Sequence, residues 1–385
     1  MARVEEADGR RRSARSGSAD TSLAGDRRDP SPGHEPDADG PRSVGEFARQ
    51  HRRALVVLLL AAVAIACVAV ILPQVVGLRG TLDRLRQGNK TWLLVGALFE
   101  AVSLGGYAAA LRTVFSWNDV CIGWRAAYQI TLAGTVATKL FAAAGAGGLA
   151  LTVWALRASG LDARAVARRI AAFQILLYAV YMGAMFFFGV GLATGLLAGG
   201  AASSVTLVPA VFGAVVIGLS LAFSRAGDRI EQGLMERART SRRGSRTMER
   251  LAAVPRTVHD GMVTAIEVLK RPRLGLLGAL VYWGFDIATL WAAFHAFGAP
   301  PPVPVVVMAY VVGQLANAIP LPGGIGGVEG GMIGAFLAFG LNGGDAVLGV
   351  LAFRAISFWL PTLPGLFAYF QLRRTIARWR EEPAR

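Results

Sequence analysis

Long apolar stretches separated by short polar segments occupy the chain from residue 54 to residue 370. An α-helix needs roughly 20 apolar residues to cross a bilayer, and six stretches are of about this length: Ala54–Leu72, Trp92–Phe115, Ile170–Leu197, Val205–Phe223, Leu274–Phe297 and Ala346–Phe370. Because a spanning helix satisfies all of its own backbone groups, this pattern predicts an all-α fold. We expect a polytopic membrane helical bundle with about six full spans.

One further apolar region is interrupted by a segment that a lipid-facing helix does not tolerate. Residues 320–331 read PLPGGIGGVEGG, with two prolines, six glycines and one carboxylate. Proline lacks a backbone donor, so the freed backbone groups need partners that lipid cannot provide. The sequence therefore predicts two apolar arms, Val303–Ile319 and Met332–Leu341, that meet at a broken tip. The residues expected to shape this tip are Pro320, Pro322, Gly323, Gly324, Gly326 and Gly327.

A second interrupted region lies between residues 124 and 160, and its centre, 139–148, reads KLFAAAGAGG. Arginines on both sides of it predict that the segment enters and leaves the membrane at the same face. Each interrupted region is either a re-entrant hairpin or a pair of complete helices. Glycines recur between the two regions at an offset of 179 residues, as from Gly134 to Gly313. Together with opposite orientation, this offset suggests an inverted repeat.

Charge sets the expected orientation and the domain boundaries. The net charge is +15, from 40 basic and 25 acidic residues, and the excess lies beside the spans. This is the pattern of the positive-inside rule, and no nucleic-acid-binding fold accompanies it. We expect a disordered cytoplasmic tail over residues 1–50, a transmembrane domain over 51–371 with a basic cytoplasmic loop at 225–272, and a basic cytoplasmic tail over 372–385, all in the cell membrane. The basic segment Arg79–Lys90 falls on the outer side in this scheme, either as an interfacial amphipathic helix or as a solvated turn.

Motifs for catalysis and metal binding are not recognisable in the sequence. It has two cysteines and four histidines, without metal-ligand spacing. It contains no P-loop, no Gly-x-Ser-x-Gly and no His-Glu-x-x-His. We therefore expect neither an enzyme nor a bound metal or cofactor.

Ionisable residues inside apolar segments are costly, so each is a candidate for function. Glu329 either caps the helix that starts near Val328 or faces a polar passage, and the two roles are compatible. Lys139 lies near the first tip and either pairs with Glu329 or Glu100, or reaches the interface from a shorter hairpin.

Three further positions complete the candidate set. Glu100 and Asp286 lie inside spans, where each is either functional or bonded to a serine, threonine or tryptophan of a neighbouring helix. Arg354 offers a planar fork for a phosphate, or it pairs with Glu329 or Asp286 for structure alone. Asn317 and the nearby Gln314 supply hydrogen bonds along the broken helix.

The motif Pro-x-Pro-Gly-Gly-x-Gly-x-x-Glu, followed by Arg354, Trp359, Pro361 and Gly365, resembles the flippase-like transmembrane domain of lysylphosphatidylglycerol synthases over roughly residues 54–370. The resemblance implies movement of a lipid or lipid-linked headgroup between leaflets, with Glu329, Arg354 and the glycines as the functional set. It does not imply aminoacyl transfer, because only a short tail follows Phe370. Many relatives carry a polar or acidic residue in the first hairpin, whereas this chain has Gly147-Gly148-Leu149.

The sequence is thus best interpreted as a flippase-like or scramblase-like protein. Its expected partners are membrane lipids, either an anionic phospholipid or a polyprenyl-phosphate-linked lipid. Two other interpretations remain at this stage: a secondary transporter of a small solute, and a non-transporting membrane partner of an envelope-lipid synthase.

Overall fold

The computed structural model describes residues 87–116, 122–140, 146–200, 203–240, 245–270, 274–298, 300–318 and 324–381. Every regular element in these ranges is a helix, which confirms the all-α prediction. The expected span Ala54–Leu72, the N-terminal tail and most of the segment Arg79–Lys90 lie outside the described residues.

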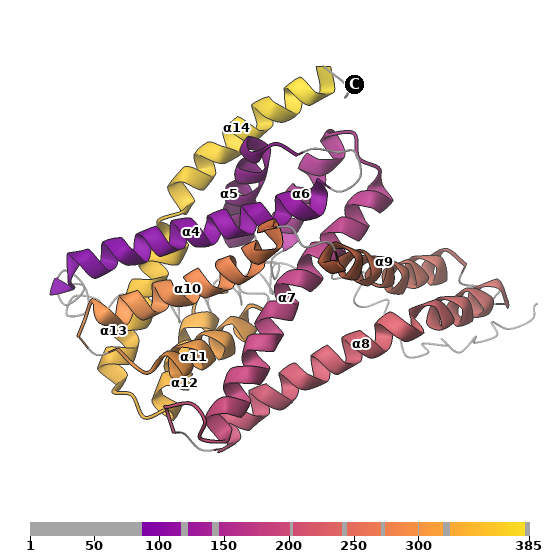
Figure 1. Cartoon of the computed structure of the whole chain (residues 1–385). Helices are drawn as coiled ribbons and strands as arrows, with labels where there is room; N and C mark the ends of the chain where they lie inside the picture. The colour runs from indigo at the N-terminus through magenta and orange to yellow at the C-terminus, as the bar shows by residue number, and fades with distance from the viewer. Residues whose placement is uncertain are drawn as a thin grey trace, which may run out of the picture. The chain divides into compact units, whose positions relative to one another are not determined.

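Five helices or continuous helical segments are long and apolar enough to cross a membrane, and they coincide with the other five predicted spans (Figure 1). They are α4 (Lys90–Phe115), α7 (Ala163–Ala193), the apolar part of α8 (Ser203–Thr240), the short η1 (Leu274–Leu277) followed by α10 (Gly278–His295), and α13 (Gly343–Arg354) followed by η4 (Ala355–Trp359) and α14 (Thr362–Glu381).

Both interrupted regions form hairpins of short helices. The first consists of α5 (Trp124–Leu140) and α6 (Ala146–Ala158), and the second of α11 (Val303–Leu315) and α12 (Gly327–Ala338). At a rise of about 1.5 Å per residue, α6, α11 and α12 are only about 18–20 Å long. The hydrocarbon core is about 30 Å thick, so these arms turn back within it. The structure thus favours re-entrant hairpins over pairs of complete helices.

The two halves of the chain repeat the same series of elements. The starts of α5, α6 and α7 precede those of α11, α12 and α13 by 179, 181 and 180 residues. The caps correspond as well: Asp162 accepts the backbone N–H of Arg164 at the start of α7, and Asn342 accepts that of Gly344 at the start of α13. This correspondence extends the glycine offset seen in the sequence to whole elements.

The hairpins also share their internal packing. A Cβ atom added to Gly148 would lie 2.6 Å from the Gly134 carbonyl oxygen, and one added to Gly331 would lie 3.0 Å from the Gly313 Cα. Real Cβ atoms do not approach backbone oxygen so closely, so the arms of the first hairpin can meet only at glycine. Gly134 and Gly313 are the pair related by 179 residues, and each faces the opposite arm of its own hairpin.

Helices α4 and α10 pack side by side in antiparallel directions at the centre of the bundle (Figure 1). Ser103 Oγ donates to the Tyr282 carbonyl at 2.8 Å, and Thr289 Oγ1 donates to the Gly96 carbonyl at 3.3 Å. The Asn89 backbone N–H donates to the Ala296 carbonyl at 2.9 Å, so the start of α4 and the end of α10 lie at one face of the bundle. This arrangement agrees with the predicted inversion of the two halves.

The predicted basic loop at 225–272 is mostly helical, which corrects the sequence-based expectation. Helix α8 continues to Thr240, and α9 spans Ser245–Lys270 and packs against both α7 and α8. Met262, Ala265 and Val268 of α9 are buried at helical spacing. An apolar stripe of this kind stabilises an amphipathic helix even when charged residues dominate the composition.

Candidate functional site

The last membrane helix is broken near its middle, and Pro361 accounts for the break. Helix α13 ends at Arg354, a π-helical turn follows over Ala355–Trp359, and α14 starts at Thr362. In a regular helix the carbonyl of Ser357 would accept the N–H of residue 361, but proline has no N–H. π-Helical turns of this kind occur frequently at functional sites.

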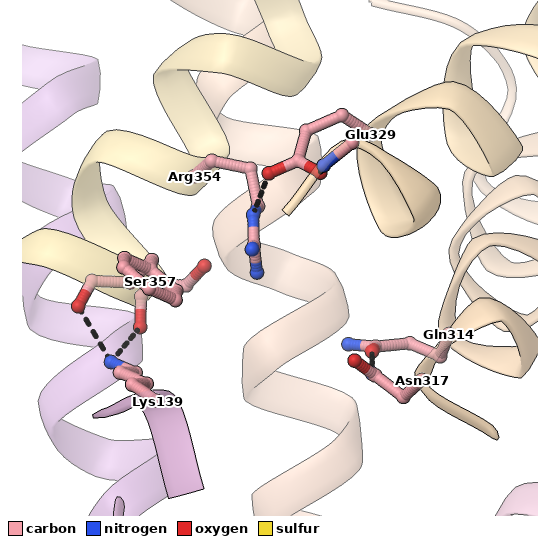
Figure 2. Close-up of polar contacts among 8 residues, drawn as sticks. Lys139, Gln314, Asn317, Glu329, Arg354 and Ser357 are labelled. Atoms are coloured by element: carbon pink, nitrogen blue, oxygen red, sulfur yellow. Dashed lines mark hydrogen bonds and ion pairs between the residues drawn. The ribbon is translucent and has the colours of Figure 1, made fainter. Parts of the chain in front are cut away.

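Lys139 bonds to the carbonyls exposed at this break. Its Nζ donates to the Ser357 carbonyl at 3.1 Å and to the Phe358 carbonyl at 2.6 Å, as Figure 2 shows. The same Nζ lies 4.9 Å from the centroid of the Phe358 ring. Lys139 therefore fastens the end of α5, at the tip of the first hairpin, to the interruption of the last helix.

Glu329 joins the tip of the second hairpin to the same helix. Its Oε1 lies 2.6 Å from Arg354 Nε, and its Oε2 accepts the Gly326 backbone N–H at 2.7 Å. The Arg354 and Glu329 side chains are only 14% and 11% exposed. The predicted capping role of Glu329 is confirmed, because α12 begins at Gly327. The predicted Lys139–Glu329 pair is wrong: each of the two side chains bonds to a different partner on the last helix.

Glycine conformation shapes the chain as it enters α12. Gly324 and Gly326 have φ angles of +66° and +84°, in the left-handed region that favours glycine. Gly327 is the first residue of the helix. The other expected tip residues, Pro320, Pro322 and Gly323, lie outside the described residues.

Arg354 and Lys139 contact the same aromatic ring. Arg354 Cζ lies 4.7 Å from the centroid of Phe358, compared with 4.9 Å for Lys139 Nζ. In Figure 2 the Arg354 guanidinium extends away from the Glu329 carboxylate. Two cations are thus placed around one buried ring, at the point where both hairpin tips reach the last helix.

Glu100 and Asp286 lie on the facing helices α4 and α10 and are only 5% and 8% exposed. Their carboxyl groups interact with each other, and the charges of Lys139 and Arg354 act on Asp286. Asp286 Oδ2 accepts the hydroxyl of Tyr310. The alternative that these acids bond to a neighbouring serine, threonine or tryptophan does not hold for the nearest candidates, because Ser103, Thr289 and Trp283 donate to backbone carbonyls.

A hydrogen-bond chain links Asp286 to the second hairpin. Gln314 Nε2 donates to the Tyr310 hydroxyl oxygen at 2.9 Å, and Asn317 Nδ2 donates to Gln314 Oε1 (Figure 2). Asn317 is exposed, whereas Tyr310 is fully buried. The structure therefore brings Asn317 and Asp286 into one network through two residues between them.

The charged residues lie at similar depth from the face that Asn89 and Ala296 mark. Glu100 is ten residues after Lys90, Asp286 nine before His295 and Arg354 eleven after Gly343. At about 1.5 Å per residue, each is about 15 Å from its helix end. That is about half the thickness of the roughly 30 Å hydrocarbon core. The sequence-predicted set therefore meets near mid-depth.

Sequence reasoning missed three members of this site. Tyr310 precedes Gln314 by four residues, a spacing that places them on one helix face and is a usable signal. The carbonyls of Ser357 and Phe358 were also missed, although Pro361 signals a freed carbonyl four residues earlier.

Comparisons with known proteins agree with this architecture. The family described as the lysylphosphatidylglycerol synthase TM region matches residues 42–365. A UPF0104 membrane protein of Methanothermobacter thermautotrophicus is 26% identical over 300 residues, which are 74% of this chain and 87% of the relative.

Two shorter matches, also to proteins of that name and organism, show higher identity. One is 33% identical over 111 residues, 29% of this chain and 32% of the relative, and the other is 34% identical over 88 residues, 23% and 26% respectively. The chain thus matches about a third of one relative and about a quarter of the other. Because the family match covers most of the chain, this multi-pass membrane protein belongs to the lysylphosphatidylglycerol synthase TM region family.

Proposed function

We propose that the protein moves the anionic headgroup of a lipid between the two leaflets while the acyl or prenyl chains stay in the bilayer. The observation that carries this proposal is the pair of cations, Lys139 and Arg354, held around Phe358 where the last helix is broken. The proposed activity makes and breaks no covalent bond.

The electrostatics of the pair favour an anion. Lys139 and Arg354 contact one ring, and the charge of each is felt by the other. Two like charges close together in a medium of low dielectric repel each other, and an anion placed between them relieves this repulsion. A guanidinium also presents parallel N–H donors that match phosphate oxygens. A phosphate group is therefore the substrate chemistry that this pair fits best.

Placement at mid-depth favours a lipid headgroup in transit. A charge at the centre of a bilayer is costly, and such charges mark substrate or ion pathways. Broken helices at this depth provide polar backbone groups that a continuous helix would keep to itself. The family name refers to a synthase of an aminoacylated phospholipid, which supports a phospholipid substrate. We further propose the cell membrane as the location, with both termini cytoplasmic.

The test is transbilayer movement in liposomes that contain the purified full chain. Fluorescent phosphatidylglycerol, a polyprenyl phosphate and phosphatidylcholine are compared, with protein-free liposomes as the baseline. The variants are Arg354→Gln and, as a matched control, Arg125→Gln, which changes an exposed arginine at the start of α5. We expect movement of at least one anionic lipid above the baseline, a loss of at least tenfold in Arg354→Gln and no change in Arg125→Gln.

Two outcomes would redirect the account. No movement of any lipid above the baseline, from protein that still binds anionic lipid, would contradict the proposal and favour a regulatory partner of an envelope-lipid synthase. Uptake of a soluble anion without lipid movement would instead favour a secondary transporter of a small solute.

A further inference from the structure

The Glu100–Asp286 pair is the part of the site that the proposed headgroup contact leaves unexplained. Both side chains are more than nine-tenths buried, and their carboxyl groups interact directly. Glu100 Oε2 and Asp286 Oδ1 are buried without a hydrogen-bond partner among the described residues. A buried polar atom without a partner is expensive, so it signals a missing ligand or a missing proton.

The charges around the pair do not suffice for both acids to ionise. The charged and titratable groups that act on it are Lys139 from α5, Arg354 from α13, Tyr310 from α11, Tyr282 from α10 itself, and more remotely Tyr107 and Tyr178. Glu329 already pairs with Arg354. Lys139 therefore remains as the main cation opposite two carboxyl groups. Carboxyl groups that share a buried site hold a proton between them rather than ionise together.

A metal ion fits this pair less well than a proton. A hard cation takes six or more oxygen ligands from carboxylates, carbonyls and water. Among the residues that the structure describes, no group of three His, Cys, Asp or Glu side chains could hold a metal ion. A single proton needs only the two oxygens that lack partners.

The pair is also connected to the broken hairpin. The chain from Asp286 through Tyr310 and Gln314 ends at Asn317, the exposed residue three positions before Pro320. Each link has a hydrogen that its neighbour can accept. A change in the protonation of Asp286 alters the acceptor at the buried end of this chain, and the chain carries that change to the hairpin tip.

We propose that Glu100 and Asp286 form a proton-binding pair that takes up a proton when an anionic headgroup binds beside Lys139 and Arg354. The physical reason is that an added negative charge near the pair disfavours its fully ionised form. Linkage makes the effect reciprocal, so lowering the pH strengthens headgroup binding. The consequence is transport of the anion together with a proton. This inference rests on the proposed function, because it assumes an anion at the cation pair.

The test measures proton uptake directly and does not require transport. Dihexanoyl phosphatidylglycerol is added to the purified full chain in weakly buffered detergent solution with a pH indicator. Its phosphodiester does not titrate near neutral pH, so any proton taken up belongs to the protein. The variants are Glu100→Gln and Asp286→Asn, and Glu267→Gln serves as the control because Glu267 is exposed on α9.

We expect uptake that approaches roughly one proton per bound lipid in the wild type and in Glu267→Gln, and little or none in the two pair variants. Infrared difference spectra should show a protonated-carboxyl band that both pair variants lose. Lipid binding without proton uptake in the wild type, or binding that depends on sodium and not on pH, would overturn the inference. Movement of anionic lipid without proton uptake would contradict this inference alone, whereas proton uptake on binding without any transbilayer movement would contradict only the proposed function.

Discussion

Glu329 and Arg354 form an ion pair of 2.6 Å that joins the start of α12 to the end of α13. The second oxygen of the same carboxylate accepts the Gly326 N–H, so one side chain both caps a helix and neutralises a buried arginine. Lys139 makes the corresponding attachment from the first hairpin, through the Ser357 and Phe358 carbonyls. Both hairpin tips are therefore held against one short segment of the last helix.

Breaking the Glu329–Arg354 pair should destabilise the protein strongly. Glu329→Gln or Arg354→Gln alone leaves one buried charge without its partner, which typically costs about 3–5 kcal/mol of unfolding free energy. The double variant should cost clearly less than the sum of the two. Thermal or denaturant unfolding in detergent measures the three values. For Lys139→Gln with Glu329→Gln the costs should add to within about 0.5 kcal/mol, because these residues share no bond. Additive costs for Glu329 and Arg354 would show that the pair does not form.

Lys139 should compensate for the donor that Pro361 lacks. Lys139→Met removes both bonds to the backbone and leaves buried carbonyls unpaired, at a cost of about 1–3 kcal/mol. Pro361→Ala returns an N–H to position 361, where it can reach the Ser357 carbonyl. We therefore expect Pro361→Ala to recover part of the stability of Lys139→Met, as measured by melting temperature. An equal effect of Pro361→Ala in the wild type and in Lys139→Met would count against this relationship.

Close glycine contacts should be equally necessary in the two hairpins. Gly148→Ala and Gly331→Ala each place a methyl group against the opposite arm, and overpacking of this kind costs about 1–3 kcal/mol. Gly334→Ala is the control on α12, because nothing lies within 4 Å of its added Cβ. The melting temperature should fall for the first two variants and stay the same or rise for the control. A fall in one hairpin only would argue against a repeated packing unit.

A small pH dependence should come from the cap of α7, outside the membrane-spanning segments. The Arg164 backbone N–H donates to Asp162 and lowers the pKa of this carboxyl group in the folded protein. The stabilisation is therefore present above the unfolded pKa of roughly 3.9 and is lost as the pH falls through the lower folded value. Asp162→Asn keeps an acceptor, as Asn342 does at the matching cap, and should remove this dependence from melting curves recorded at several pH values. An unchanged pH profile in Asp162→Asn would assign the dependence to other groups.

Much of this fold follows from residue periodicity. Five predicted spans and both hairpins appear at the expected positions, because lipid requires continuous helices and the Pro/Gly segments cannot continue one. The capping role of Glu329 was predictable from its place beside Val328. The α8–α9 region was not, because its charged residues suggest a solvated loop, and its helices depend on a stripe of buried residues around Met262 and Ala265.

The partners of the charged residues could not be predicted in the same way. Lys139 had two plausible acids, and the choice of backbone carbonyls depends on α5 packing against α14 and on the break at Pro361. Tyr310 resembles any aromatic residue of an apolar helix until Asp286 is found against its hydroxyl. Long-range packing, which one sequence does not reveal, decided both cases.

The account depends most directly on Glu329 lying deep within the bilayer. Gly330 is exposed beside it and has open space around an added Cβ, so a fluorophore attached to Gly330→Cys, in a chain with Cys67→Ala and Cys121→Ala, reports its depth. Quenching is measured in liposomes with lipids that carry nitroxides at different depths. The account predicts the strongest quenching by nitroxides deep in the acyl chains, about 15 Å from the helix ends. Strongest quenching by headgroup nitroxides, or by a water-soluble quencher alone, would contradict it.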